Sequence, residues 1–174
     1  MTTSKALRLG LIGVGNMGSA HARMIAEGEV KGAVLSGVCD HDPRKCEHFA
    51  SARYFPNAKD LIASGEVDGV VVATPHYDHP DSVIAALEAG LHVLVEKPLA
   101  VDKADAERML AAYANRPRPE QVFAEMFNQR TDPRYQTLKQ LLERGELGPI
   151  RRISWTITDW FRSEAYYRSG GWRV

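Results

Sequence analysis

Short apolar runs alternate along this chain with segments whose apolar residues recur at helical spacing. The runs predict buried strands, because strands covered on both faces lose the alternation of apolar and polar side chains. We expect these strands at residues 7–12, 33–39, 54–55, 69–73, 91–95 and 121–125. The helices between them are expected at residues 16–26, 42–52, 59–64, 80–89 and 102–115. Such alternation predicts an α/β fold built on a doubly wound parallel sheet.

The pattern changes after about residue 125. A helix is predicted at residues 132–144, where an Asp-Pro pair supplies a cap and a suitable first residue. Residues 150–161 alternate in a way that suits an antiparallel strand with one covered face. One strand cannot form a stable sheet alone. We therefore predict a parallel-sheet domain at residues 1–124 and the incomplete start of an antiparallel-sheet domain at residues 125–174.

The charge balance of the chain argues against binding to nucleic acid and to membranes. Lys and Arg together number 22, as do Asp and Glu, so the net charge is zero. A neutral chain has no overall attraction for nucleic acid or an anionic membrane. No apolar run approaches the ~20 residues that a membrane helix needs. We expect a cytoplasmic protein that binds neither nucleic acid nor membrane.

The cysteines and histidines near residue 40 raise the question of a metal. Cys39, His41, Cys46 and His48 form a C-x-H…C-x-H cluster. The spacing suits zinc poorly, because Cys39 should point into the sheet while Cys46 and His48 lie on the next helix. We expect no metal site and two reduced thiols.

A glycine-rich loop joins the first predicted strand to the first predicted helix. It reads GVGNMG, a complete G-x-G-x-x-G motif. The first glycine permits a tight turn, the second lets the backbone approach a pyrophosphate, and the third lets helix and strand pack closely. The loop predicts a Rossmann-type dinucleotide site; a doubly wound domain without nucleotide is the alternative. Its loop residues are Gly13, Gly15, Asn16, Met17 and Gly18.

An acidic residue follows the glycine loop at the expected distance. Asp40 lies 22 residues after Gly18 (40 − 18), at the end of the second predicted strand. A carboxylate there accepts hydrogen bonds from the adenosine ribose hydroxyls and repels a 2′-phosphate. The cofactor is therefore expected to be NAD, although Arg44 is close enough to soften the preference against NADP.

Polar residues follow the most hydrophobic of the predicted strands. At the carboxyl end of a parallel strand they should lie over the cofactor. An ordinary solvated turn explains the pattern equally well for His76 and Tyr77. We include this whole segment in the candidate cofactor site, namely Ala73, Thr74, Pro75, His76 and His79.

The strand predicted at residues 91–95 ends in Glu96, Lys97 and Pro98. Pro98 favours an extended conformation at Lys97 and allows a cis peptide bond between them. A partly desolvated lysine at this place can act as a general acid–base group, so Lys97 is the candidate catalytic residue. An ion pair with Glu96 and a plain surface charge are the alternatives. All three residues are assigned to the cofactor site.

These motifs together resemble the glucose–fructose oxidoreductase, inositol dehydrogenase and rhizopine-catabolism family, called Gfo/Idh/MocA. The resemblance spans essentially the whole chain. It rests on residues 13–18, Asp40, 73–75 with His79, 89–93, 96–99, 127–130, 148–150 and 170–173.

The resemblance implies roles for particular residues. Lys97 would lie beside the nicotinamide and the substrate hydroxyl. Asn128, Arg130, Trp172 and Arg173 would begin an α+β substrate domain. Family members are roughly twice as long as this chain, and a later histidine or aspartate works with the lysine. This chain therefore resembles the N-terminal portion of such an enzyme.

The expected reaction is hydride transfer between NAD and a hydroxyl-bearing carbon of a sugar, cyclic polyol or related small molecule. As a 174-residue chain it should bind NAD but turn over poorly. A non-catalytic nucleotide-binding regulatory or assembly module is the alternative. The full-length form is expected to be a homo-oligomer.

Overall fold

A computed structural model describes residues 5–158 and 161–168 of the chain. The structure divides into two compact units, Met1–Met126 and Phe127–Val174. Each unit is described by itself.

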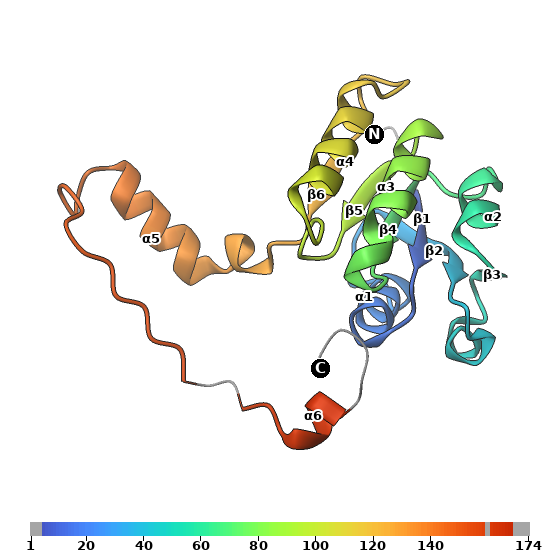
Figure 1. Ribbon diagram of the computed structural model, residues 1–174, viewed down its shortest axis with the longest axis horizontal. Helices are drawn as coiled ribbons and strands as arrows, with labels where there is room; N and C mark the ends of the chain where they lie inside the picture. Colours follow the sequence, from blue (N-terminus) through green and yellow to red (C-terminus); the bar gives the residue numbers. More distant parts are fainter. Residues whose placement is uncertain (1–4, 159–160, 169–174) are drawn as a thin grey trace. The chain divides into compact units, whose positions relative to one another are not determined.

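The first unit is built around one six-stranded sheet (Figure 1). Its strands are all parallel and lie in the order β3-β2-β1-β4-β5-β6. The order reverses between β1 and β4, which makes this the switch point where open α/β sheets bind ligands. The predicted Rossmann-type sheet is confirmed. The strands are β1 (Leu7–Ile12), β2 (Ala33–Cys39), β3 (Arg53–Phe55), β4 (Gly69–Val72), β5 (His92–Val95) and β6 (Phe123–Glu125).

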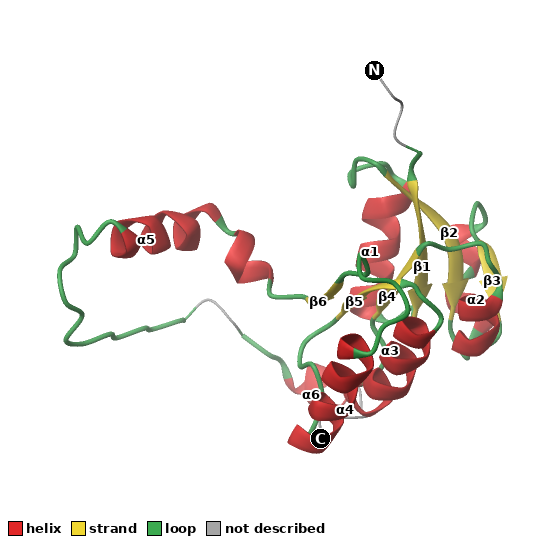
Figure 2. Cartoon of the chain, turned by 90° about the horizontal axis from the view of Figure 1, so that it is seen from above, coloured by secondary structure: helices red, strands yellow, loops and turns green. Residues whose placement is uncertain are grey.

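Helices connect the strands and cover both faces of the sheet. Figure 2 shows α1 on one face, with α3 and α4 on the other. The Asn57 side chain caps α2 by accepting from the Asp60 N–H, and Asp102 caps α4 by accepting from the Asp105 N–H. The helices are α1 (Asn16–Ala26), α2 (Ala58–Ala63), α3 (His79–Glu88) and α4 (Lys103–Ala114), with 3-10 turns η1 (Pro43–Lys45), η2 (Glu47–Phe49) and η3 (His76–Asp78).

The core lies on both sides of the sheet. Leu61 of α2, Leu87 of α3 and Met109 of α4 are fully buried on one side. Ala22 and Ile25 of α1 are buried on the other. Because each fully buried aliphatic side chain contributes roughly 1.5–3 kcal/mol, these contacts fix the strands whose ends form the site.

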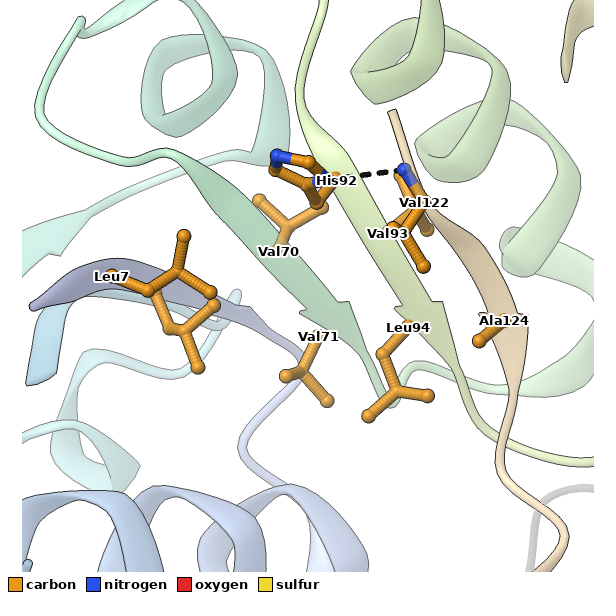
Figure 3. Close-up of a pocket in the computed structure, with 9 residues that line it drawn as sticks. Leu7, Val70, Val71, His92, Val93, Leu94, Val122 and Ala124 are labelled. Carbon is orange, nitrogen blue, oxygen red and sulfur yellow. Dashed lines mark hydrogen bonds between the residues drawn. The ribbon is translucent and has the colours of Figure 1, made fainter. Parts of the chain in front are cut away.

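An apolar hollow of about 440 Å³ lies against the sheet. Figure 3 shows side chains from β1, β4 and β5 and from the segment at β6 around it, with the Val122 N–H donating to His92 Nδ1 at 3.0 Å. The lining includes Leu7, Leu9, Val71, Leu94, Val122 and Ala124. It carries few polar groups and lies apart from the carboxyl ends of β1 and β2.

The helix predicted at residues 42–52 is wrong. The segment forms the two short turns η1 and η2 instead. Its buried residues Cys46, Phe49 and Ala52 are spaced three apart. That period matches the three residues per turn of a 3-10 helix rather than the 3.6 of an α-helix.

The second unit contains η4 (Asn128–Thr131), α5 (Pro133–Glu143) and α6 (Glu164–Arg168). The helix predicted at 132–144 is confirmed. The strand predicted at 150–161 is wrong for residues 150–158 and 161, which form no strand; Asp159 and Trp160 lie outside the described residues. The alternating side chains of Ile153, Trp155 and Ile157 are 79, 60 and 54% exposed. A strand needs a partner for its backbone groups.

Candidate functional site

A pocket of about 450 Å³ opens at the carboxyl ends of β1, β2 and β4. It lies at the switch point of the sheet, where a dinucleotide would be expected. Segments far apart in the sequence meet here because the parallel strands all point to this edge. Its lining includes Gly13, Gly15, Asp40, Lys45, Thr74 and Pro75.

The three glycines of the loop meet three different spatial demands. Gly13 has a positive φ of 91°, and a Cβ there would lie 2.8 Å from backbone atoms of Ala73 and Thr74. A Cβ on Gly18 would lie 1.8 Å from the carbonyl oxygen of Gly13. A Cβ on Gly15 would meet nothing within 4 Å. The backbone at Gly15 therefore faces open space, as required for close approach of a pyrophosphate.

The start of α1 provides hydrogen-bond donors at the same place. Gly15 is the N-cap residue, and it has no side chain to satisfy the first N–H groups. Asn16 and Met17 form the first turn, and Met17 is half-exposed. Free N–H groups and the helix dipole favour an anion here.

Asp40 is held firmly at the end of β2 and is 6% exposed. Its carboxylate accepts from the Val14 N–H at 2.8 Å, the Asp42 N–H at 2.9 Å and Lys45 Nζ at 3.1 Å. Burial acts to raise the pKa of Asp40, but these donors outweigh it and the pKa is lowered. The carboxylate is therefore ionised at neutral pH and aimed into the pocket.

The cation beside Asp40 is Lys45, which sequence reasoning missed. Arg44, the predicted cation, donates from Nε and from Nη2 to the Asp42 carboxylate, at 2.8 Å in each case. His41 Nδ1 lies 3.3 Å from Asp40 Oδ1. Lys45 is the last residue of the turn η1, which follows Asp40. Its contact with Asp40 could be expected only if that segment were known to form a 3-10 turn.

The loop after β4 contains a buried hydroxyl group, that of Thr74. Among the described residues, Thr74 Oγ1 is a buried side-chain atom with no hydrogen-bond partner. Thr74 lines the pocket between Ala73 and Pro75. Buried polar groups are rarely left unpaired, so this hydroxyl fits a ligand that supplies its partner. Together with Gly15 and Asp40, it shows that the residues present fit a dinucleotide.

His79 lies behind the pocket and is fully buried. Its Nδ1 is 3.0 Å from the carbonyl oxygen of Pro98, and its Nε2 is 3.0 Å from that of Thr74. His79 therefore ties the loop after β4 to the loop after β5. His76 is half-buried, and its pKa is lowered by burial and further by the nearby His79 and Lys97.

The segment after β5 brings Glu96 and Lys97 to the same edge. Glu96 is 6% exposed, and its Oε1 lies 2.7 Å from Nε2 of His21 on α1. The Lys97 N–H donates to Glu96 Oε2 at 3.2 Å. His21, another residue that sequence reasoning missed, therefore takes the ion-pairing position considered for Lys97.

Lys97 itself is exposed, and its peptide bond to Pro98 is cis. The partial desolvation expected from the sequence is therefore not supplied by the described residues. The reason is that this loop stands at the rim of the sheet edge, with Glu96 turned inward and Lys97 turned outward.

The predicted substrate residues belong to the second unit. Asn128 and Arg130 lie on η4 and are exposed, and the Arg130 guanidinium carbon stands 5.0 Å from the centre of the Phe127 ring. Arg130 also lines a hollow of about 400 Å³ with neighbouring residues of that unit. Trp172 and Arg173 lie outside the described residues, so their role stays a prediction.

The sheet order, the glycine loop and the held acid define a Rossmann-type, dinucleotide-binding protein. The chain belongs to the Gfo/Idh/MocA family, described as an oxidoreductase family with an NAD-binding Rossmann fold, whose sequence model matches residues 7–124. The family resemblance inferred from the motifs is confirmed, and NAD is the cofactor of this fold.

Known relatives agree with that membership. The chain is 34% identical over 151 residues to an inositol 2-dehydrogenase of Corynebacterium glutamicum strain R, covering 84% of this chain and 44% of that one. It superimposes on scyllo-inositol dehydrogenase of Lactobacillus casei, solved with NAD(H) and scyllo-inositol, with a TM-score of 0.74 and 27% identity, covering 83% and 43% of the two chains.

A second solved structure matches more of the chain. The WlbA dehydrogenase of Bordetella pertussis, solved with NADH and UDP-GlcNAcA, gives a TM-score of 0.79 at 30% identity, covering 95% of this chain and 50% of that one. The chain thus spans about half the length of the relatives it matches.

The described residues contain neither a membrane-spanning helix nor a cluster of metal ligands. None of their helices has the length and apolar character needed to cross a bilayer. Within the same residues, no three His, Cys, Asp or Glu side chains gather as metal ligands would. Cys39 and Cys46 are buried free thiols, and burial raises the pKa of Cys39 to about 12.

Proposed function

We propose that this chain is the NAD-binding part of a dehydrogenase that transfers a hydride between nicotinamide and a hydroxyl-bearing carbon. The substrate is a sugar, a cyclic polyol or a related small molecule. The observation that carries the proposal is the pocket at the switch point, where Gly15, Asp40 and Thr74 converge. The named relatives, all dehydrogenases, support this reading over a non-catalytic module.

The domain organisation is part of the same proposal. Residues 1–124 form the dinucleotide-binding domain, and residues 125–174 begin the substrate domain. Asn128 and Arg130 would face the substrate, as would Trp172 and Arg173. We also propose that the longer protein is a cytoplasmic homo-oligomer.

Each residue of the pocket contacts a different part of the cofactor. Asp40 accepts hydrogen bonds from the ribose hydroxyls, and the N–H groups at the start of α1 face the pyrophosphate. Open space at Gly15 admits the phosphates. The Thr74 hydroxyl gains the partner it lacks. When bound, NAD supplies the hydride acceptor.

Lys97 holds and moves the proton. Its ammonium group lies at the carboxyl end of β5, near His76. Glu96, anchored by His21, accepts the Lys97 N–H and so positions the backbone that carries this side chain. Lys97 Nζ would polarise the substrate hydroxyl or accept its proton as the carbon loses its hydride.

The test is a calorimetric titration of the chain with NADH. Wild type should bind, and Asp40→Asn should bind about tenfold or more weakly, since hydrogen bonds to a charged group contribute roughly 1.5–3 kcal/mol. Glu107→Gln is the matched control, because it removes one carboxylate from an exposed site on α4. Equal affinity in all three proteins would contradict the proposal.

The role of Lys97 is tested separately. Lys97→Met should lose less NADH affinity than Asp40→Asn, because Lys97 does not line the pocket at the carboxyl ends of β1, β2 and β4. In a polyol panel, the chain itself is expected to turn over poorly, since Lys97 is exposed. Turnover that persists in Lys97→Met would exclude this assignment.

A further inference from the structure

A histidine behind the pocket faces a hydrogen-bond acceptor at each of its ring nitrogens. His79 is the first residue of α3 and is fully buried. Its Nδ1 lies 3.0 Å from the carbonyl oxygen of Pro98, and its Nε2 lies 3.0 Å from the carbonyl oxygen of Thr74. Both are distances of N–H···O hydrogen bonds. Because a carbonyl oxygen only accepts, each bond requires a proton on the ring nitrogen.

A neutral imidazole ring cannot make both bonds. It carries one N–H group and one bare nitrogen, so either tautomer would leave a lone pair facing a carbonyl oxygen at 3.0 Å. A buried acceptor without a donor is unfavourable. The imidazolium form has an N–H group on both nitrogens. Burial opposes the charge, but hydrogen bonds from a charged donor are roughly twice as strong as neutral ones, and this ring makes two of them.

Two other histidines have different surroundings. Nδ1 of His92 accepts the Val122 N–H at 3.0 Å, so that nitrogen carries no proton. Nε2 of His21 lies 2.7 Å from the Glu96 carboxylate, which supplies a negative charge. His79 instead has a neutral carbonyl group at both nitrogens. Its two contacts therefore depend on a second proton on the ring itself.

The two carbonyl groups belong to loops that take part in the proposed reaction. Thr74 lines the cofactor pocket, and among the described residues its buried hydroxyl has no partner. Pro98 directly follows Lys97, the candidate acid–base residue. A rigid ring bonded to both carbonyl groups fixes the spacing between the two loops. Loss of either bond would release one loop from the other.

We infer that His79 is a positioning residue for Lys97, and that it acts as an imidazolium whose two N–H groups hold the loops of Thr74 and Pro98 together. The positioning role rests on the proposed function, because it concerns the lysine that moves the proton. The charge on His79 follows from its two contacts alone.

Charged and titratable groups from each neighbouring segment surround this ring. His76 of η3 meets it edge-on, with ring centres 5.8 Å apart. The pKa of His76 is lowered by burial and by the nearby His79 and Lys97. Asp78, which precedes His79, is exposed. Other charged side chains on the segments around the ring pair with one another, namely Glu96 with His21, and Asp81 and Asp105 with Arg108.

The experiment records long-range ¹H–¹⁵N correlations of the histidine rings in the 174-residue chain at pH 7. Both nitrogens of His79 should carry a proton, whereas His92 should show a bare Nδ1 and so serves as an internal reference. His79→Gln identifies the His79 signals; should that variant not fold, they are the set left after assigning the other histidines of the six in the chain. A bare nitrogen on His79 would overturn the inference.

The positioning role is measured at the backbone amides of Thr74 and Lys97. As pH is raised and the His79 ring loses a proton, both amide signals should shift with the midpoint of that ring, because one carbonyl bond is lost. In His79→Gln both amides should differ from wild type and lose this shift. His48→Gln, which removes an exposed ring on η2, is the matched control and should behave as wild type.

Amide signals that ignore the His79 ring in wild type, or that are unchanged in His79→Gln, would overturn the positioning role. A separate titration with NADH distinguishes this result from failure of the proposed function. If wild type binds no NADH, the proposed function fails, while the ring protons of His79 are still measured, because their detection needs no nucleotide.

Discussion

Two single methyl groups, added to the same loop, should have opposite consequences. Gly18→Ala places a Cβ 1.8 Å from the carbonyl oxygen of Gly13, whereas ordinary contact begins at 3.4 Å. The loop would have to move by about 1.6 Å (3.4 − 1.8), and its neighbour is backbone rather than a flexible side chain. Gly15→Ala meets nothing within 4 Å and keeps an allowed extended backbone at φ −80°.

Two opposing free-energy contributions determine the stability of Gly18→Ala. Replacing Gly18, which lies inside α1, with Ala would by itself gain roughly 0.5–1 kcal/mol from helix propensity. Overpacking typically costs 1–3 kcal/mol or more, and a backbone clash stands at the upper end of that range. We therefore expect Gly18→Ala to lower the free energy of unfolding by about 2 kcal/mol. Gly15→Ala should leave stability unchanged or raise it by roughly 0.4–1 kcal/mol.

The Gly15 substitution should weaken NADH binding although it preserves stability. The Gly15 methyl group enters the space through which a pyrophosphate reaches the loop, so NADH affinity should fall about tenfold or more. Urea unfolding followed by circular dichroism reports stability, and calorimetry reports affinity. Gly18→Ala as stable as wild type, or Gly15→Ala with normal affinity, would refute the reasoning.

Two further predictions concern single side chains. Thr74→Val should leave stability unchanged or raise it, because it removes a buried hydroxyl without a partner. The same substitution should lower NADH affinity. Urea unfolding measures the first effect and calorimetric titration the second, and a loss of stability would contradict the prediction. Arg8 holds the pKa of Asp68 at about 2 against an ordinary 3.8, through a hydrogen bond. Stability from this pair should be present above pH 3.8 and lost as pH falls through about 2. Urea midpoints of wild type and Asp68→Asn should converge over that range, and a constant difference would contradict the pair's role.

The first βα unit could be predicted from the sequence because its determinants are local. An unbroken apolar run gives β1 (Leu7–Ile12), and the glycines give the loop before α1 (Asn16–Ala26); both elements have the predicted bounds. Each residue there meets a demand set within a few positions of the chain. Asp40 follows for a similar reason, since the end of β2 and the motif distance coincide.

The groups that surround Asp40 and Glu96 could not be predicted in the same way. The contact of His21 with Glu96 joins residues 75 positions apart. The link from His79 to Pro98 depends on the lateral order of β4 and β5. Lys45 faces Asp40 only because residues 43–49 form 3-10 turns rather than the expected helix. The sequence pattern indicates the strands that carry a site, but the pairing of side chains across those strands depends on the tertiary fold.

The two ends of the candidate site differ in burial: the described residues enclose one end and leave the other exposed. At the adenosine end, Asp40 is buried and held by backbone donors, and the pocket encloses it. At the reaction end, Lys97 is exposed. Electrostatic and proton-transfer catalysis gain most of their strength where water is excluded. On the proposed assignment, the contacts for nucleotide binding lie within the first unit, whereas efficient proton transfer at Lys97 requires a covering surface that the described residues do not provide. Variants of this chain should consequently be ranked by affinity, because affinity reports the contacts that the first unit supplies.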